Sequence, residues 1–250
     1  MKIELHRKNI HTGNLILVNA DYPYNEQVNE TDLVNVDKSA CDVLLERRAV
    51  TLLSKLMEEI NGWGQISAVS GWRSMQEQEN IYAQSLKENG SEFTQKYVAL
   101  PGHSEHQTGL AIDLALTSDN IDFIRPDFPY TGICQTFREL SSQYGFIERY
   151  PQKKESITGI AHEPWHFRYI GVPHAEIMKK NDLCMEEYIP FIKQFAYGEQ
   201  KYNFTVAQKN FSVSYLPASE AEIVCIEIAE DVSYTISGNN IDGYIITEWR

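Results

Sequence analysis

The chain has 250 residues, of which 42% are hydrophobic and 23% are charged, a composition typical of a globular protein. Its formal net charge of −13 argues against binding to a nucleic-acid backbone, because that interaction requires a basic surface. The four cysteines lack C-x-x-C spacing. We therefore expect these residues to be reduced and mostly packed in the interior, although disulfide pairing outside the cell stays open. They are Cys41, Cys134, Cys184 and Cys225.

The N-terminal region contains no apolar core of the kind found in signal peptides. Its longest apolar run, residues 15–18, is far shorter than the roughly 20 residues that cross a membrane. We expect no membrane segment and, if Met1 is the native start, a cytoplasmic protein. Residues 1–36 are predicted to be irregular apart from a short strand over 14–18.

Residues 38–60 are predicted to form a helix, because leucine and isoleucine recur along one face and Gly62 is a suitable end. A strand is expected to follow over residues 65–69. These two elements would begin an α+β domain.

Residues 74–77 carry the capping-box pattern S-x-x-E, formed by Ser74 and Glu77. This pattern predicts a helix that starts after Ser74 and runs to about residue 87. A second short helix is expected over 91–98. Arg73 therefore lies between the end of a strand and the start of a helix, a position where loops commonly carry functional side chains.

Residues 104–113 carry the pattern S-x-H-x-x-G-x-A-x-D. Its aspartate, Asp113, interrupts an apolar, strand-compatible run, and burying a lone carboxylate is costly unless a cation or several donors compensate it. His106 lies seven residues earlier, across Gly109, which lets the chain fold back. An imidazole and a carboxylate brought together in this way suit a divalent metal, although a satisfied core aspartate beside a loop histidine explains the same pattern.

The stretch that follows is predicted to alternate between irregular and regular structure. Residues 117–133 are polar and aperiodic, and the sequence leaves open whether they form a flap over a site or a surface connection. The regular elements expected after them are a helix over 135–144, strands over 146–150 and 157–169, and helices over 173–180 and 185–195.

Five short β-rich runs occupy residues 199–250, which predicts a small antiparallel module that docks on the preceding domain. The expected domains are 1–198, an α+β catalytic domain with a small antiparallel sheet flanked by helices, and 199–250. We expect the second domain to stabilise the first or to line its cleft, because no catalytic group of residues is visible in it.

Residues 163–166 carry a second motif, E-x-W-H, formed by Glu163, Trp165 and His166. Together with the pattern over 104–113, it resembles the zinc D,D-peptidases that act on peptidoglycan precursors, the family of VanX, VanY and VanXY. The resemblance covers about residues 40–195.

The resemblance implies a role for several side chains. Zinc would be held by His106, Asp113 and His166, and Glu163 would be the catalytic base. Arg73 would face the scissile carbonyl. Ser104 and Gln78 would help to hold the substrate.

The segment from His162 to His166 also satisfies H-E-x-x-H, the zinc-binding signature of helical metallopeptidases. That signature requires a helix, in which Pro164 is tolerated only in the first turn, and the flanking residues are β-branched and aromatic. We therefore predict a strand here and place His162 outside the ligand set.

The function implied by the resemblance is that of a zinc-dependent D,D-carboxypeptidase and D,D-dipeptidase, closest to cytosolic VanXY. Its substrates would be D-Ala-D-Ala and D-Ala-ending pentapeptide precursors, and its role would be resistance to vancomycin-type glycopeptides. Two alternatives stay open: a cell-wall endopeptidase of the same fold, and a non-catalytic zinc-binding module like those of hedgehog signalling domains. Glu163 and Arg73 argue against the module, since a structural zinc needs neither. Nothing in the sequence specifies an oligomeric state.

Overall fold

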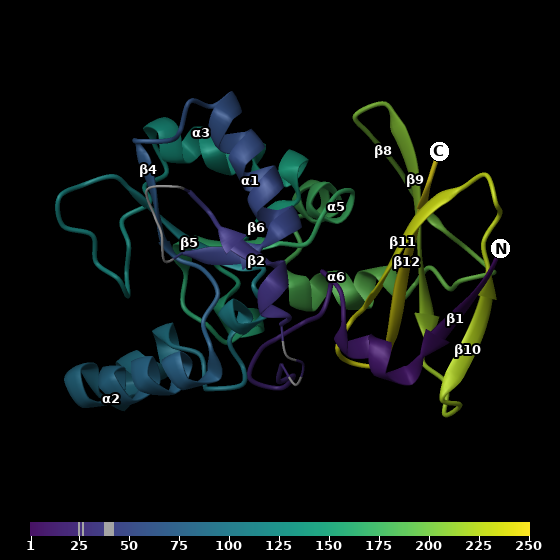
Figure 1. The fold of residues 1–250 in the computed structure, drawn as a ribbon, viewed down its shortest axis with the longest axis horizontal. Helices are drawn as coiled ribbons and strands as arrows, with labels where there is room; N and C mark the ends of the chain where they lie inside the picture. Colours follow the sequence, from purple (N-terminus) through teal and green to yellow (C-terminus); the bar gives the residue numbers. More distant parts are fainter. Residues whose placement is uncertain (25, 27, 38–42) are drawn as a thin grey trace. The chain divides into compact units, whose positions relative to one another are not determined.

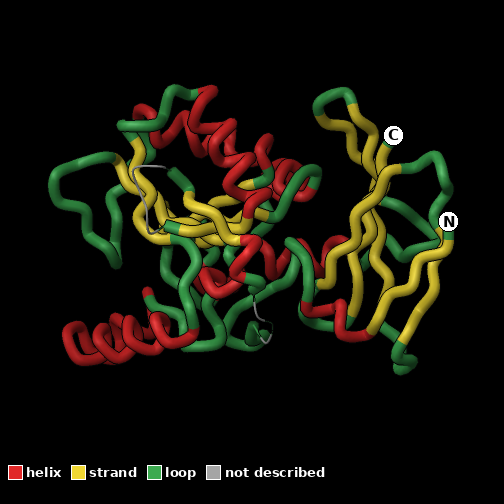
Figure 2. The backbone as a smooth tube through the Cα atoms, in the orientation of Figure 1, coloured by secondary structure: helices red, strands yellow, loops and turns green. Residues whose placement is uncertain are grey.

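The computed structural model describes residues 1–24, 26, 28–37 and 43–250. These residues form two compact units, one of Val18–Ala175 and one that combines Met1–Leu17 with Glu176–Arg250. Both units contain helices and small antiparallel sheets (Figures 1 and 2), which confirms the predicted α+β class. The predicted helix start at residues 38–42, including Cys41, lies outside the described residues.

The larger unit is built on a four-stranded antiparallel sheet in the order β4-β5-β7-β6. Its strands are β4 (Ile66–Ser70), β5 (Ala111–Leu116), β7 (Glu163–Tyr169) and β6 (Phe146–Tyr150). The central strands β5 and β7 are almost wholly buried. Polar side chains on these two strands are therefore removed from bulk water and need partners inside the protein.

Helix α1 (Arg47–Glu59) begins later than predicted. Residues Leu44–Glu46 form a strand, β3, which pairs with β2 (Leu33–Asn35), and the Glu46 carboxylate then caps the helix by accepting two backbone N–H groups. The leucine face predicted for this helix packs into the core, where Leu53 and Leu56 are fully buried.

Helix α2 (Met75–Tyr97) is two helical segments joined at Gly90, which has a φ of 79°. Ser74 caps the first segment as predicted: its hydroxyl accepts the N–H of Glu77, and the Glu77 carboxylate accepts the N–H of Ser74 at 2.7 Å. The two predicted helices are confirmed, together with the break between them.

The strand expected over 157–169 is correct only from Glu163 onward. Residues Glu155–Thr158 form a helical turn, α4, which ends at Gly159 in the left-handed conformation. The reversal at Gly159 separates the β-branched Ile157 and Thr158 from the sheet. Before it, α3 (Gly132–Leu140) and the 3-10 helix η4 (Ser141–Tyr144) cover the predicted helix over 135–144 and stop at Gly145.

The smaller unit contains a four-stranded sheet in the order β11-β12-β9-β8 and a separate pair of strands, β1 and β10. All five C-terminal strands predicted from the sequence are present: β8 (Tyr202–Val206), β9 (Lys209–Pro217), β10 (Ile223–Glu227), β11 (Ser233–Gly238) and β12 (Gly243–Trp249). Helix α6 (Met185–Ile192) belongs to this unit, and α5 (His174–Asn181) starts after Pro173 as predicted.

Two N-terminal predictions are wrong. β1 (Lys2–His6) was not expected, and residues 14–18 form no strand, although Leu15 and Leu17 are buried. The backbone N–H of Leu15 donates to the Ser237 hydroxyl, and that of Leu17 donates to the carbonyl of Asn239. These isolated hydrogen bonds satisfy backbone N–H groups of the buried segment 15–18, although the segment pairs with no described strand.

Contacts between residues divide the chain after Ala175, whereas the boundary predicted from the sequence lies after residue 198. The first 17 residues belong to the same unit as the C-terminal part. Tyr197 and Tyr215, for example, are linked by a backbone hydrogen bond of 2.8 Å. The functional division into 1–198 and 199–250 stays a prediction. Among the described residues, no helix has the length and apolar character needed to cross a membrane.

Replacement of Leu53 by alanine tests whether α1 carries the core of the larger unit. We expect Leu53→Ala to lower the free energy of unfolding by about 2–5 kcal/mol, because the side chain is fully buried and leaves a cavity. Urea denaturation would measure the change. In the matched control, Leu86→Ala on α2, the side chain is 39% exposed and the change should stay within about 0.5 kcal/mol. Equal losses in the two variants would contradict this packing.

Candidate active site

The register of the larger sheet places three polar residues in one row. Asp113 on β5 lies opposite Ser70 on β4 and opposite His166 on β7. Residues directly opposite each other in an antiparallel pair share a face, so their side chains meet. The Asp113 Oδ1 atom lies 2.9 Å from His166 Nδ1, and both side chains are about 5% exposed.

A tight reversal brings His106 to the same place. His106 lies in the 3-10 helix η3 (Glu105–Thr108), which ends at Gly109 with a φ of 71°. A Cβ atom at Gly109 would lie 2.9 Å from Leu33 Cδ2, so both the conformation and the space favour glycine here. From Gly109 the chain turns directly into β5, and His106 Nε2 comes to lie 3.1 Å from Asp113 Oδ2.

The other nitrogen of His106, Nδ1, lies 2.6 Å from the carbonyl oxygen of Gly71. Because a carbonyl oxygen only accepts, Nδ1 carries a proton, which leaves Nε2, beside Asp113, as the nitrogen that could bind a metal ion. Gly71 itself is needed for close packing, since a Cβ atom there would lie 2.2 Å from the carbonyl oxygen of Leu44.

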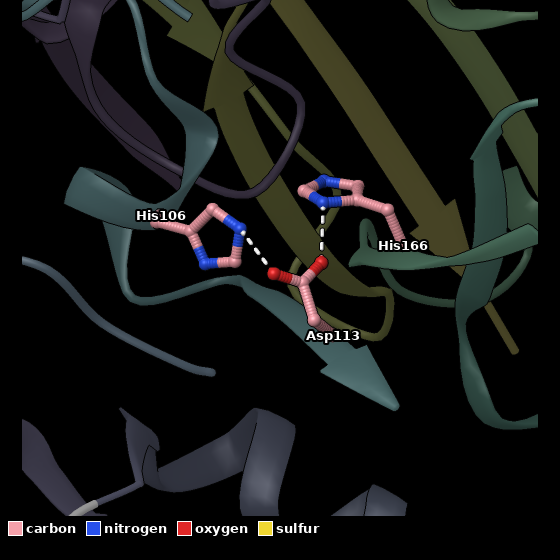
Figure 3. A group of neighbouring side chains, drawn as sticks. All are labelled: His106, Asp113 and His166. Carbon is pink, nitrogen blue, oxygen red and sulfur yellow. Dashed lines mark hydrogen bonds and ion pairs between the residues drawn. The ribbon is translucent and has the colours of Figure 1, made fainter. Parts of the chain in front are cut away.

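His106 and His166 approach the Asp113 carboxylate from different elements and contact different oxygens of it (Figure 3). One ligand atom from each of the three residues lies within 4.8 Å of the others. Two imidazoles and one carboxylate are ligands that Zn²⁺ accepts in open, catalytic sites. The geometry and the chemistry of this buried group therefore fit a metal ion.

The charges of this group depend on one another. Burial alone would raise the pKa of Asp113, but the charge and hydrogen bonds of the two histidines hold it below its usual range. Burial and the nearby Arg73 lower the pKa of His106 to about 4. Burial alone would lower the pKa of His166, but the hydrogen bond to Asp113 and the nearby carboxylate of Glu105 outweigh it and raise the pKa to about 9.

Arg73 lies against the same carboxylate. Its Nη2 donates to Asp113 Oδ2 at 3.0 Å, and its Nε donates to the Ser70 hydroxyl at 2.8 Å. The ring of Phe123 lies 5.5 Å from its guanidinium carbon. These contacts fix the guanidinium in the wall of the pocket, where it can donate to a bound group.

Glu163 begins β7, three residues before His166, and is 5% exposed. Its Oε2 lies 3.9 Å from His166 Nδ1. Burial, together with Asp113, raises the pKa of Glu163 to about 8, while His166 and Arg73 oppose the shift. A carboxylate whose pKa lies near neutrality can both accept and return a proton.

The structure brings all seven predicted site residues into one pocket. Gln78 is buried, with its amide nitrogen donating to the Ala99 carbonyl at 2.8 Å and its Oε1 without a hydrogen bond. Ser104 is 2% exposed. The predicted residues that line the pocket are Arg73, Gln78, Ser104, His106, Asp113, Glu163 and His166.

His162 lies outside this group. Its Nε2 lies 2.6 Å from the Tyr130 hydroxyl, and its side chain is 22% exposed. Glu163–Tyr169 is a strand as predicted, so His162 and His166 do not share a helix face. The interpretation of H-E-x-x-H as a helical metal motif does not hold in this fold.

Sequence reasoning missed a buried ionic cluster behind His166. The Glu105 carboxylate contacts Arg149 on β6 and Arg168 on β7, and all three side chains are 0% exposed. Burial opposes ionisation of Glu105, but the two guanidinium groups hold its pKa below the usual range. Both arginines lie in strands that also carry other polar residues, so no local signal in the sequence marked them as buried.

A sequence model of the family described as "VanY: D-alanyl-D-alanine carboxypeptidase" matches residues 42–172. The chain belongs to the VanY family. The chain is also similar to the bifunctional D-Ala-D-Ala dipeptidase and carboxypeptidase VanXYC of Enterococcus gallinarum, with 39% identity over 181 residues. That match covers 72% of this chain and 95% of the relative.

Two solved structures extend the comparison. The vancomycin-resistance D,D-dipeptidase VanXYg, solved with a D-Ala-D-Ala phosphinate analogue, is 49% identical with a TM-score of 0.97 and covers 100% of this chain and 99% of its own. A VanY D,D-pentapeptidase from a VanB-type resistance cassette, solved with Zn(II), is 30% identical with a TM-score of 0.59. It covers 70% of this chain and 98% of its own.

The geometry predicts different roles in zinc binding for the two histidines of the 162–166 segment. We expect His166→Ala to weaken zinc binding by more than the roughly 10–100-fold that loss of an outer partner costs, because a direct ligand is removed. His162→Ala should leave the affinity unchanged. Competition with a chromophoric chelator would measure both dissociation constants, and weaker binding by His162→Ala alone would reverse the assignment.

Proposed function

We propose that this chain is a zinc D,D-peptidase that hydrolyses D-Ala-D-Ala and removes the terminal D-Ala of peptidoglycan pentapeptide precursors. The observation that carries the proposal is the His106–Asp113–His166 group, with Glu163 and Arg73 in the same pocket. Membership of the VanY family and the activities of the relatives VanXYC and VanXYg support the substrate class. The role would be the elimination of D-Ala-ending precursors during resistance to vancomycin-type glycopeptides.

Three side chains would hold the metal. His106 would use Nε2, because its Nδ1 donates to the Gly71 carbonyl, and His166 would use Nδ1, which already faces Asp113. When bound there, zinc acidifies a water molecule and polarises the carbonyl of the scissile bond. Three protein ligands leave a position open for this chemistry, unlike the four that close a structural site.

Glu163 would transfer the proton. In its ionised form it takes a proton from the attacking water and then delivers it to the amine of the departing D-Ala. The raised pKa favours the delivery step, and the positive charge of Arg73 favours the ionised form that must act first. Because the attacking group is water, no covalent enzyme intermediate is formed.

Arg73 would stabilise the negative charge that develops on the carbonyl oxygen. Its guanidinium group is held by Ser70 and Asp113, so little reorganisation is needed when the charge appears. Ser104 and Gln78 would hold the substrate: both are buried in the pocket wall, and Gln78 Oε1 has acceptor capacity to spare. The likeness to the VanXY type supports a cytoplasmic location.

Product analysis tests the substrate class. The zinc-loaded protein should release D-Ala from D-Ala-D-Ala and from a pentapeptide precursor that ends in D-Ala-D-Ala. Chromatography of the amino-acid products would measure both reactions, with D-Ala-D-Ser as a competing substrate. Cleavage only between L-alanine and D-glutamate would support the endopeptidase alternative, and zinc binding without any cleavage would support the non-catalytic module.

Replacement of Glu163 separates proton transfer from metal binding. We expect Glu163→Ala to lower kcat by about 10²–10⁴-fold, because the general base is lost, while the three metal-holding side chains stay in place. Zinc content and kcat would be measured on the same preparation. A variant that keeps zinc and near-parental kcat would exclude Glu163 as the base.

A further inference from the structure

The Glu105 carboxylate is satisfied on one oxygen only. Its Oε1 accepts from Arg149 Nε at 2.8 Å and lies 3.0 Å from Arg168 Nη1. A carboxylate and two guanidinium groups are expensive to bury, and their mutual attraction offsets that cost. Both arginines contact the same oxygen, so the ion pairs do not account for the position of the other one.

That other oxygen, Oε2, points toward His166. It has no hydrogen bond among the described residues, and neither does His166 Nε2, although both atoms are buried. The two atoms lie 3.5 Å apart. Buried polar atoms without partners are rare in folded proteins, and a separation of 3.5 Å is only slightly longer than a hydrogen bond.

We propose that Glu105 is a positioning residue for His166, holding the proton on Nε2 and so leaving the Nδ1 lone pair directed at the metal. The inference rests on the metal site of the proposed function. An ionised carboxylate only accepts hydrogen bonds, and a neutral imidazole carries one N–H, so with a metal ion on Nδ1 this partner would hold the remaining proton on Nε2. It also fixes the plane of the ring and increases the basicity of Nδ1.

The two metal-holding histidines thus receive opposite tautomers from different acceptors. His106 has its proton on Nδ1, facing the carbonyl of Gly71, and offers Nε2. Without a metal ion, His166 Nδ1 donates to Asp113 at 2.9 Å; with a metal ion on Nδ1, the remaining proton would lie on Nε2, facing Glu105. Arg149 and Arg168 hold the Glu105 carboxylate in place on the side away from His166.

The substitution Glu105→Asp separates positioning from charge balance. Aspartate keeps a negative charge beside the two arginines but is shorter by one methylene group, so it withdraws the acceptor from His166. We expect the dissociation constant for zinc to rise about 10–100-fold, the usual cost of losing an outer partner of a metal-bound histidine. Competition with a chromophoric chelator measures it without reference to activity.

Glu148→Asp is the matched control. Glu148 is on β6, next to Arg149, and its carboxylate pairs with Arg138 at 2.5 Å, but it contacts none of the three metal-holding residues. Zinc affinity should not change in this variant. Folded Glu105→Asp protein with the affinity of the unaltered protein would overturn the inference, as would equal weakening in both variants.

A measurement on the unaltered protein decides the question even if Glu105→Asp does not fold. In the zinc-loaded protein with ¹⁵N-labelled histidine, NMR should show a slowly exchanging proton on His166 Nε2. A proton on Nδ1, or none protected on Nε2, would overturn the inference while leaving the metal site intact. If the unaltered protein binds no zinc, the proposed function fails, and this inference fails with it.

Discussion

A carboxylate buried in the middle of a sheet is the constraint on which the larger unit depends. Asp113 is 4% exposed, on a central strand. A charge in such a place is tolerated only when several donors or a cation surround it. In this structure His106, His166 and Arg73 all lie within 3.1 Å of its oxygens.

These partners come from three different parts of the chain, so the compensation of one charge orders much of the fold. His166 is placed by strand register, and His106 by the left-handed turn at Gly109 and the carbonyl of Gly71. Arg73 lies at the end of β4, just before the helix that Ser74 caps. The groups that satisfy Asp113 are also the groups that the proposed chemistry uses, and Glu105 extends the same arrangement behind His166.

The grouping of His106, Asp113 and His166 was predictable because these residues lie in two short motifs that resemble those of a known peptidase family. A run of apolar residues around Asp113 and the β-branched and aromatic residues that flank the 162–166 segment both predicted strands, and paired strands bring side chains together. The cluster of Glu105 with Arg149 and Arg168 was not predictable in this way. Its members belong to three elements, and no local pattern distinguishes a buried arginine from an exposed one.

The errors in the predicted secondary structure also arise from features that a local sequence pattern does not reveal. Residues 14–18 have a strand-like composition, but the hydrogen bonds that satisfy them come from Ser237 and Asn239, more than 200 residues away. Residues 157–162 are interrupted by the left-handed turn at Gly159, and β3 takes the place of the first part of a helix predicted from its leucines. In each case long-range pairing or a turn overrode local propensity.

A crystal structure of the protein grown with zinc, with the ion located by anomalous scattering, tests the central claim most directly. The account predicts one ion at about 2.0–2.2 Å from His106 Nε2, an Asp113 carboxylate oxygen and His166 Nδ1. It also predicts that Glu105 Oε2 lies within hydrogen-bond distance of His166 Nε2. An ion held by His162, or by His166 through Nε2, would contradict the account.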